Sequence, residues 1–154
     1  MCNAIHKTSS KFFDSLVEEE KKKGSVIKLE EQNKVILCNE NGEEIEIELA
    51  DKTHYTQAGF DIKRTVYCKD TQEKQVIVYE VKSTVIPESM SFIELSKAQF
   101  SESLKRRQNF YLVRLLLHSK TLDCLKMIQL NDIPEQLALS SLEYQGGRVT
   151  FYMV

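Results

Sequence analysis

An apolar segment over residues 110–117 constrains the fold more than any other feature of the sequence. Arg114 is its only charged residue. A strand with one face in water alternates apolar and polar residues, whereas a strand buried on both faces is a continuous apolar run. The segment therefore predicts a strand in the middle of a sheet. Residues 122–130 are expected to form its hairpin partner.

Helical spacing of apolar residues and capping signals predict helices elsewhere in the chain. Ser96 and Gln99 have the spacing of a capping box, in which each side chain accepts a hydrogen bond from the backbone N–H of the other residue. The expected helices are one that Ser9 or Ser10 caps and Gly24 ends, one from Ser96 to about residues 106–107, and a short one from Pro134 to Leu139.

Strands are predicted where β-branched residues or strict alternation recur between turn signals. Residues 43–49 alternate glutamate with isoleucine or leucine, so one face is apolar and the other wet. Asn41–Gly42 predicts a two-residue turn before them. The other expected strands are residues 26–29, 35–38, 59–68, 76–84 and 91–95, with residues 148–154 as an edge strand after Gly146–Gly147.

These elements predict a mixed α/β fold of the α+β kind, and 154 residues suit one domain. The net charge of -2 excludes a broadly basic surface, so nucleic-acid contacts must rest on local basic clusters. No apolar stretch reaches transmembrane length, and no signal peptide is visible. The scattered cysteines disfavour a zinc site and fit reduced thiols in a cytoplasmic protein.

The segment Tyr79–Lys82 carries the most informative chemistry. Alternate side chains of a strand share a face, so Glu80 and Lys82 point the same way, while Tyr79 and Val81 point into apolar surroundings. A short turn after the preceding strand is expected to lay Asp61 against Glu80. Two carboxylates that meet over a sheet can hold Mg²⁺, which prefers oxygen ligands, and an adjacent ammonium can stabilise a developing anion.

An aspartate, a gap and then Glu-x-Lys on the next strand resembles the motif of the PD-(D/E)xK, or restriction-endonuclease-like, nucleases. The sequence is most similar to the domain at the C-terminus of protein NO VEIN, which also occurs in helicase-like and restriction-associated proteins. The resemblance covers about residues 10–117, and its matching segments are residues 59–62, 79–84, 92–96 and 110–115.

This resemblance implies a restriction-endonuclease-like core of one helix, three strands, a helix and a strand, with a mixed central sheet flanked by helices. The chain is then one nuclease-like domain over residues 10–154. Residues 25–50 form an extra β-hairpin inserted near its N-terminus, and residues 118–154 are C-terminal additions.

The resemblance also implies that Asp61, Glu80 and Lys82 are catalytic residues, with Mg²⁺ or Mn²⁺ as the cofactor. Asp61 and Glu80 would bind the ion together with the carbonyl of Val81. Lys82 would position the attacking water or stabilise the transition state.

Other residues carry over less directly from the family. Its first helix contributes an acid ahead of a glycine, and Asp14, ahead of Gly24, corresponds to that acid, with Glu20 as the alternative. Asp14 itself departs from the usual pattern, in which this acid is a glutamate, and so do two further positions. Gly59–Phe60 replaces the proline that names the motif, and Gln99 replaces a glutamate early in the second helix.

Two basic features complete the candidate site. Lys105, Arg106 and Arg107 close the second helix, where cations suit the helix dipole and where a phosphate backbone could also bind. Arg114 needs a partner if it is buried, and an aspartate or glutamate of the site is expected to provide one.

These features predict a metal-dependent nuclease that hydrolyses DNA phosphodiester bonds in defence or repair. The alternative is a catalytically inactive fold of the same kind that binds nucleic acid or protein within a larger system. DNA, a helicase-like or defence-system protein and a second copy of the chain are the expected partners. No association with a membrane is expected.

Overall fold

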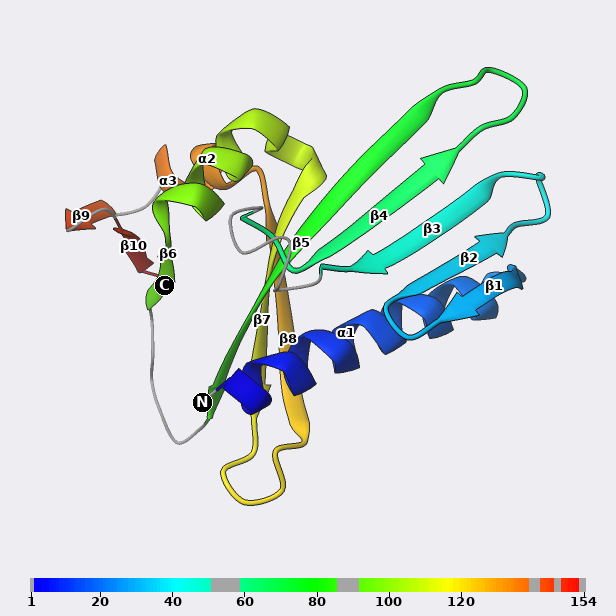
Figure 1. The fold of residues 1–154 in the computed structure, drawn as a ribbon. Coiled ribbons are helices and arrows are strands. Elements are labelled where there is room, and N and C mark those ends of the chain that lie inside the picture. The colour runs from blue at the N-terminus through cyan, green and yellow to red at the C-terminus, as the bar shows by residue number, and fades with distance from the viewer. Residues whose placement is uncertain (1, 51–58, 86–91, 139–141, 146–147, 153–154) are drawn as a thin grey trace. The chain divides into compact units, whose positions relative to one another are not determined.

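The computed structural model describes residues 2–50, 59–85, 92–138, 142–145 and 148–152, so the loop expected at residues 52–58 lies outside the described residues. The elements, shown in Figure 1, are α1 (Cys2–Lys22), β1 (Val26–Glu31), β2 (Lys34–Cys38), β3 (Glu44–Leu49), β4 (Ile62–Tyr67), β5 (Lys74–Val85), β6 (Phe92–Leu95), α2 (Lys97–Arg106), the 3₁₀ helix η1 (Arg107–Asn109), β7 (Phe110–Leu117), β8 (Cys124–Asn131), α3 (Ile133–Ala138), β9 (Leu142–Gln145) and β10 (Arg148–Tyr152).

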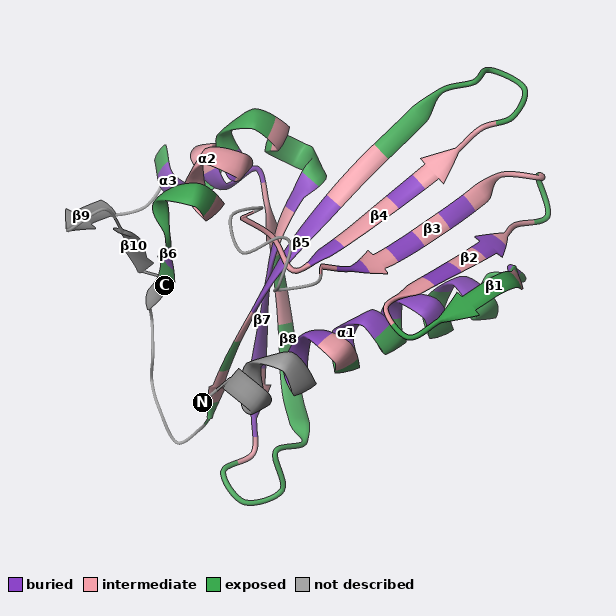
Figure 2. Cartoon of the chain, viewed as in Figure 1, coloured by how far each residue is buried: buried purple, intermediate pink, exposed green. Residues whose placement is uncertain are grey.

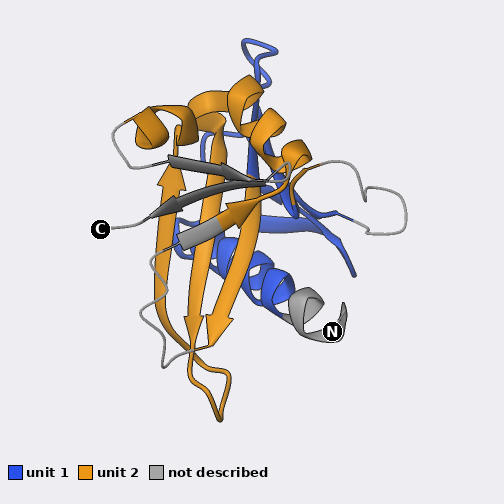
Figure 3. Cartoon of the chain, turned by 90° about the vertical axis from the view of Figure 1, so that its left-hand side faces the viewer, with its two compact units in different colours: residues 1–56, 61–78 blue, residues 57–60, 79–154 orange. Residues whose placement is uncertain are grey.

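The strands form two sheets, and the mixed α/β class is confirmed. The larger sheet has seven strands in the order β1-β2-β3-β4-β5-β7-β8, and the smaller has the order β6-β10-β9. The chain divides into two compact units, coloured separately in Figure 3. The first unit comprises residues 1–56 and 61–78, and the second comprises residues 57–60 and 79–154. Each unit is described by itself below.

In the first unit, α1 packs against β3. Phe12, Phe13, Leu16 and Val17 are the buried face of the helix, as their spacing predicts. The buried residues of β3 alternate with half-buried glutamates (Figure 2). The expectation that Ser9 or Ser10 caps this helix is wrong, because α1 begins at Cys2 and Ser9 is buried within it. A small serine fits on a packed helix face as well as at a cap.

The turn between β2 and β3 is longer than the two residues expected at Asn41–Gly42. The backbone N–H of Asn39 donates to the carbonyl of Glu43 at 3.0 Å, which leaves three residues between them. The side-chain Oδ1 of Asn39 accepts from the N–H groups of Asn41 and Glu43 at 3.0 and 2.9 Å. Gly42 has a φ of +76°, the left-handed conformation that closes a three-residue hairpin loop.

In the second unit, β7 is the buried strand that its apolar sequence predicts. Phe110, Leu112 and Val113 are fully buried, and α2 and α3 both contact the strand. Its antiparallel partner β8 ends the larger sheet and is mostly exposed. The capping box at Ser96 is confirmed, and Pro134 lies in the first turn of α3 as expected.

The C-terminal strand β10 is not an edge strand. It pairs antiparallel with β6 on one side and with β9 on the other, so it is the central strand of the smaller sheet. The local sequence gives the conformation of such a strand but does not give the number of its neighbours.

Candidate active site

Strand β5 places Glu80 and Lys82 on one face, as the alternation of a strand requires. The Nζ of Lys82 lies 3.0 Å from Oε1 of Glu80. Glu80 is buried, at 5% exposure, whereas the side chain of Lys82 is 33% exposed. Between them, Val81 is buried, and the ring of neighbouring Tyr79 stacks on Tyr111 with centroids 5.5 Å apart. The predicted same-face pair is therefore confirmed, with its ammonium reaching solvent and its carboxylate enclosed.

Gln99 of α2 links this pair to the start of the helix. Its Oε1 accepts from the backbone N–H of Ser96 at 2.8 Å and from Nζ of Lys82 at 3.2 Å. Its Nε2 donates to Oε1 of Glu80. One amide therefore completes the capping box and also bridges the carboxylate and the ammonium. The sequence indicates the first of these roles but contains no signal for the second.

Replacing Gln99 with alanine is expected to lower the free energy of unfolding by about 1–3 kcal/mol, because buried Glu80 loses a donor and α2 loses half of its capping box. Chemical denaturation monitored by circular dichroism measures the change. Gln108→Ala, at an exposed position in η1, is the control and is expected to cost little. Equal stabilities of the two variants would contradict the bridging role.

Asp61 lies immediately before β4 in the first unit and is half-buried. Its backbone carbonyl accepts from the N–H of Ala50 at 2.7 Å. The short turn between β4 and β5 is present, since the N–H of Cys68 donates to the carbonyl of Glu73 at 3.0 Å. Asp61 and Glu80 belong to different units, so their convergence stays a prediction.

Gly59, which replaces the proline of the motif, lies against α2. A Cβ at this position would be 2.7 Å from the carbonyl oxygen of Ala98 and 2.9 Å from Cγ of Glu102, and the φ of Gly59 is +73°. Glycine therefore meets two requirements here, a left-handed backbone and a close approach to the helix.

We expect Gly59→Ala to lower the free energy of unfolding by about 2–3 kcal/mol, because strain and overlap add. Gly42→Ala is the matched control. It has a similar φ of +76° but no atom within 4 Å of the added Cβ, so it is expected to cost only about 1 kcal/mol. Thermal unfolding of both variants measures the difference. Similar losses would show that the contact with α2 is unimportant.

The two candidate acids of α1 differ in their surroundings. Asp14 is exposed and lines a hollow of about 430 Å³ beside β1, together with Glu18, Glu30 and other residues. Glu20 is buried, as its position on the apolar side of the helix predicts, and its Oε1 lies 2.8 Å from the guanidinium of Arg64. Glu20 therefore has a structural partner of its own in the first unit.

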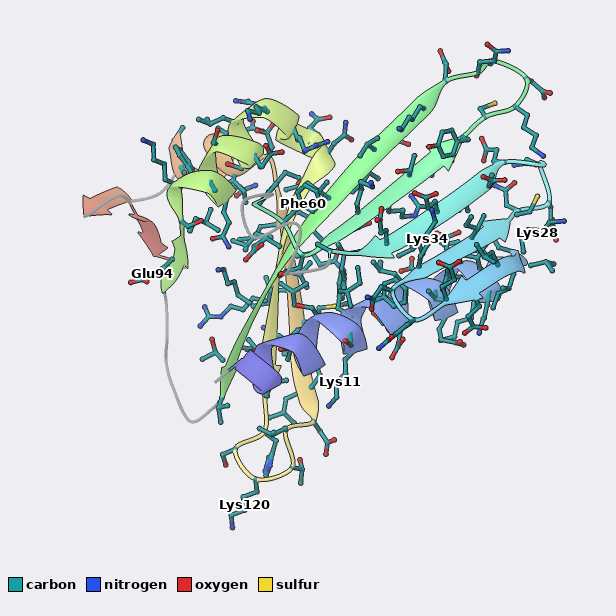
Figure 4. All side chains as sticks on the ribbon, viewed as in Figure 1. Lys11, Lys28, Lys34, Phe60, Glu94 and Lys120 are labelled. Atoms are coloured by element: carbon teal, nitrogen blue, oxygen red, sulfur yellow. The ribbon has the colours of Figure 1, made fainter. Side chains whose placement is uncertain are left out.

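The basic residues at the end of α2 are held in ion pairs. Lys105 and Arg106 lie 3.2 and 2.8 Å from the carboxylate of Glu102, and Arg107 lies 3.0 Å from Asp132. The guanidinium of Arg106 also lies over the ring of Phe60, at 5.8 Å (Phe60 is labelled in Figure 4). A phosphate contact would compete with these pairs, and the nucleic-acid role of the three residues stays a prediction.

The partner expected for Arg114 is wrong. This residue is buried in β7, at 4% exposure, and a guanidinium nitrogen donates to the hydroxyl of Thr84 at 3.4 Å. Among the described residues this hydroxyl, and not the expected carboxylate of the site, is its hydrogen-bond partner. Burial lowers the pKa of Arg114 below its usual value.

The donor set around Glu80 fits a hard divalent cation. In the part of the chain that the structure describes, no three His, Cys, Asp or Glu residues lie close enough to hold a metal ion. Mg²⁺ requires fewer protein ligands, because it binds through one or two carboxylates and keeps several waters. The carboxylate of Glu80 and the carbonyl of Val81 supply oxygen from one strand, so these residues are compatible with such an ion.

The chain has an α/β fold with a glutamate–lysine pair on an inner strand of its larger sheet. The sequence matches the family described as "Protein NO VEIN, C-terminal" over residues 10–127. This chain belongs to that family, and the match continues beyond β7 into β8. No curated protein and no solved structure matches the chain. Among the described residues, no helix is both long and apolar enough to cross a membrane.

Proposed function

We propose that this chain is a divalent-metal-dependent nuclease of the PD-(D/E)xK kind that hydrolyses DNA phosphodiester bonds. One observation carries the proposal. Glu80 and Lys82 share a face of β5 with 3.0 Å between Oε1 and Nζ, and the carboxylate is buried while the ammonium is partly open to solvent. A carboxylate and an ammonium fixed side by side are the two groups that this type of site requires.

In this proposal, Asp61, Glu80 and the carbonyl of Val81 hold Mg²⁺ or Mn²⁺. When bound, such an ion lowers the pKa of a water and offsets charge on the phosphoryl group. Lys82 donates to the attacking water or to a phosphoryl oxygen, where negative charge develops. Gln99 holds that ammonium in position through its Oε1. Asp14 is the proposed second acid.

The proposed setting is a cytoplasmic one in defence or repair, with a helicase-like or defence-system protein as a partner. DNA is the proposed substrate, and Lys105, Arg106 and Arg107 are its proposed phosphate contacts. A second copy of the chain is a further candidate partner, because β8 is an exposed strand at the end of the larger sheet.

A second function is favoured by the position of Gln99. Its side-chain amide already hydrogen-bonds to Glu80 and Lys82. The resemblance implies a glutamate at this position. A chain with this arrangement could act as a catalytically inactive nucleic-acid- or protein-binding module.

Plasmid nicking distinguishes these functions. Supercoiled DNA is incubated with the purified protein and Mg²⁺ or Mn²⁺, with chelator as the blank. The nuclease proposal predicts open circles that depend on the metal and on Lys82. Equally intact DNA with wild type and with Lys82→Ala would contradict it and favour the binding module.

A further inference from the structure

We infer that Arg114 and Thr84 form a phosphate-binding subsite beside the Glu80–Lys82 pair. The inference rests on the proposed function for the identity of its ligand, a phosphate of the nucleic-acid strand next to the one that is cleaved. The subsite itself rests on the positions of two side chains in the second unit.

The two side chains lie on the face of the sheet that carries the catalytic pair. Glu80, Lys82 and Thr84 alternate along β5, so their side chains share one face. The 3.4 Å contact between Arg114 and the hydroxyl of Thr84 brings β7 into the same face. Strands rise about 3.3 Å per residue, so Thr84 stands roughly 6–7 Å beyond Lys82. The subsite is therefore adjacent to the pair without overlapping it.

An anion would compensate the buried positive charge of Arg114. The guanidinium is permanently charged and buried, and its Nε has no hydrogen-bond partner in the described part of the chain. Leu112, two residues before it on the same face of β7, is fully buried and apolar. A buried charge is normally compensated by an opposite one, whereas Arg114 has only the neutral hydroxyl of Thr84 among the described residues. A buried polar group left without a partner often marks the place of an ion or a functional contact.

A phosphate fits this subsite better than a simple halide. The planar guanidinium donates two parallel hydrogen bonds to a phosphate, and the hydroxyl of Thr84 adds a third donor. The end of β5 that carries Thr84 is partly accessible to solvent, because Thr84 is half-buried and Val85 is 43% exposed. An anion can therefore approach along the strand that carries Lys82.

Inorganic phosphate is the probe for a direct test. Thermal unfolding is followed while phosphate is titrated against sodium chloride of equal ionic strength. Wild type is expected to show a saturable rise in Tm that both Arg114→Met and Thr84→Val lose. In buffer without phosphate, Arg114→Met is expected to melt at the wild-type temperature or above it, because an uncompensated charge has been removed.

Lys120→Met is the matched control, since Lys120 is exposed in the loop between β7 and β8 (Figure 4). It is expected to keep the phosphate response. An equal rise in Tm for wild type, Arg114→Met and Thr84→Val would overturn the subsite.

Kinetics separate this inference from the proposed function. With an active nuclease, Arg114→Met is expected to raise KM for DNA about tenfold with little change in kcat, as for a ground-state contact. An unchanged KM would contradict the subsite alone. A wild type that binds phosphate through Arg114 but never cuts DNA would contradict the proposed function and leave the subsite standing.

Discussion

Lys82→Ala is expected to lower the metal-dependent nicking rate about 100- to 1000-fold, the usual loss when one donor to a developing anion is removed. The ammonium of Lys82 lies 3.0 Å from Glu80 and 3.2 Å from Oε1 of Gln99, so two partners fix its position before substrate binds. Lys82→Arg is expected to recover little of this rate, because a planar guanidinium is larger than the ammonium that this site holds.

The measurement is the initial rate of supercoil loss, with protein concentration and metal held constant. The side chain of Lys82 is one-third exposed, so its removal is expected to leave the fold intact, and a thermal melt verifies this. Lys97→Ala, an exposed lysine at the start of α2, is the control and should nick at the wild-type rate. Wild-type activity in Lys82→Ala would rule out a catalytic role for this ammonium.

Phe110→Ala is expected to destabilise the protein by about 3–5 kcal/mol, the usual cost of truncating a buried phenylalanine. Phe110 is fully buried at the first position of β7, in the strand whose continuous apolar sequence predicts the middle of the sheet. The loss combines the transfer free energy of the ring with the cavity that its removal leaves.

Urea denaturation followed by circular dichroism measures this loss. Leu125→Ala is the matched control from the hairpin partner β8, because Leu125 is 57% exposed. It is expected to change the free energy of unfolding by less than about 0.5 kcal/mol. Similar losses in the two variants would contradict the different burial of β7 and β8.

Local patterns predicted most of the elements, because period and capping are properties of neighbouring residues. The alternation in Tyr79–Lys82 placed Glu80 and Lys82 on one face, and the Ser96–Gln99 spacing gave the start of α2. The apolar run of β7 predicted its burial. In each case the sequence pattern and the structural feature that it predicts lie within the same few residues.

The errors arose where distant segments decide the outcome. The sequence of β10 does not reveal that two strands flank it, and the sequence of β7 does not reveal that Arg114 meets a threonine of β5. The hydrogen bond from Gln99 to Glu80 could not be predicted for the same reason, since a capping box does not indicate which strand lies beside the helix. Burial of Ser9 likewise depends on what packs over α1.

Isothermal titration of Mn²⁺ into wild type, Glu80→Gln and Asp61→Asn tests most directly whether this face holds a catalytic metal. Thermal melts verify that each variant is folded, and Glu135→Gln, at an exposed glutamate of α3, serves as the control. The proposal predicts Mn²⁺ binding by wild type and the control, and affinity at least about tenfold weaker in each of the other variants. Binding that is the same in all four proteins, or absent from wild type, would contradict a metal site at Glu80.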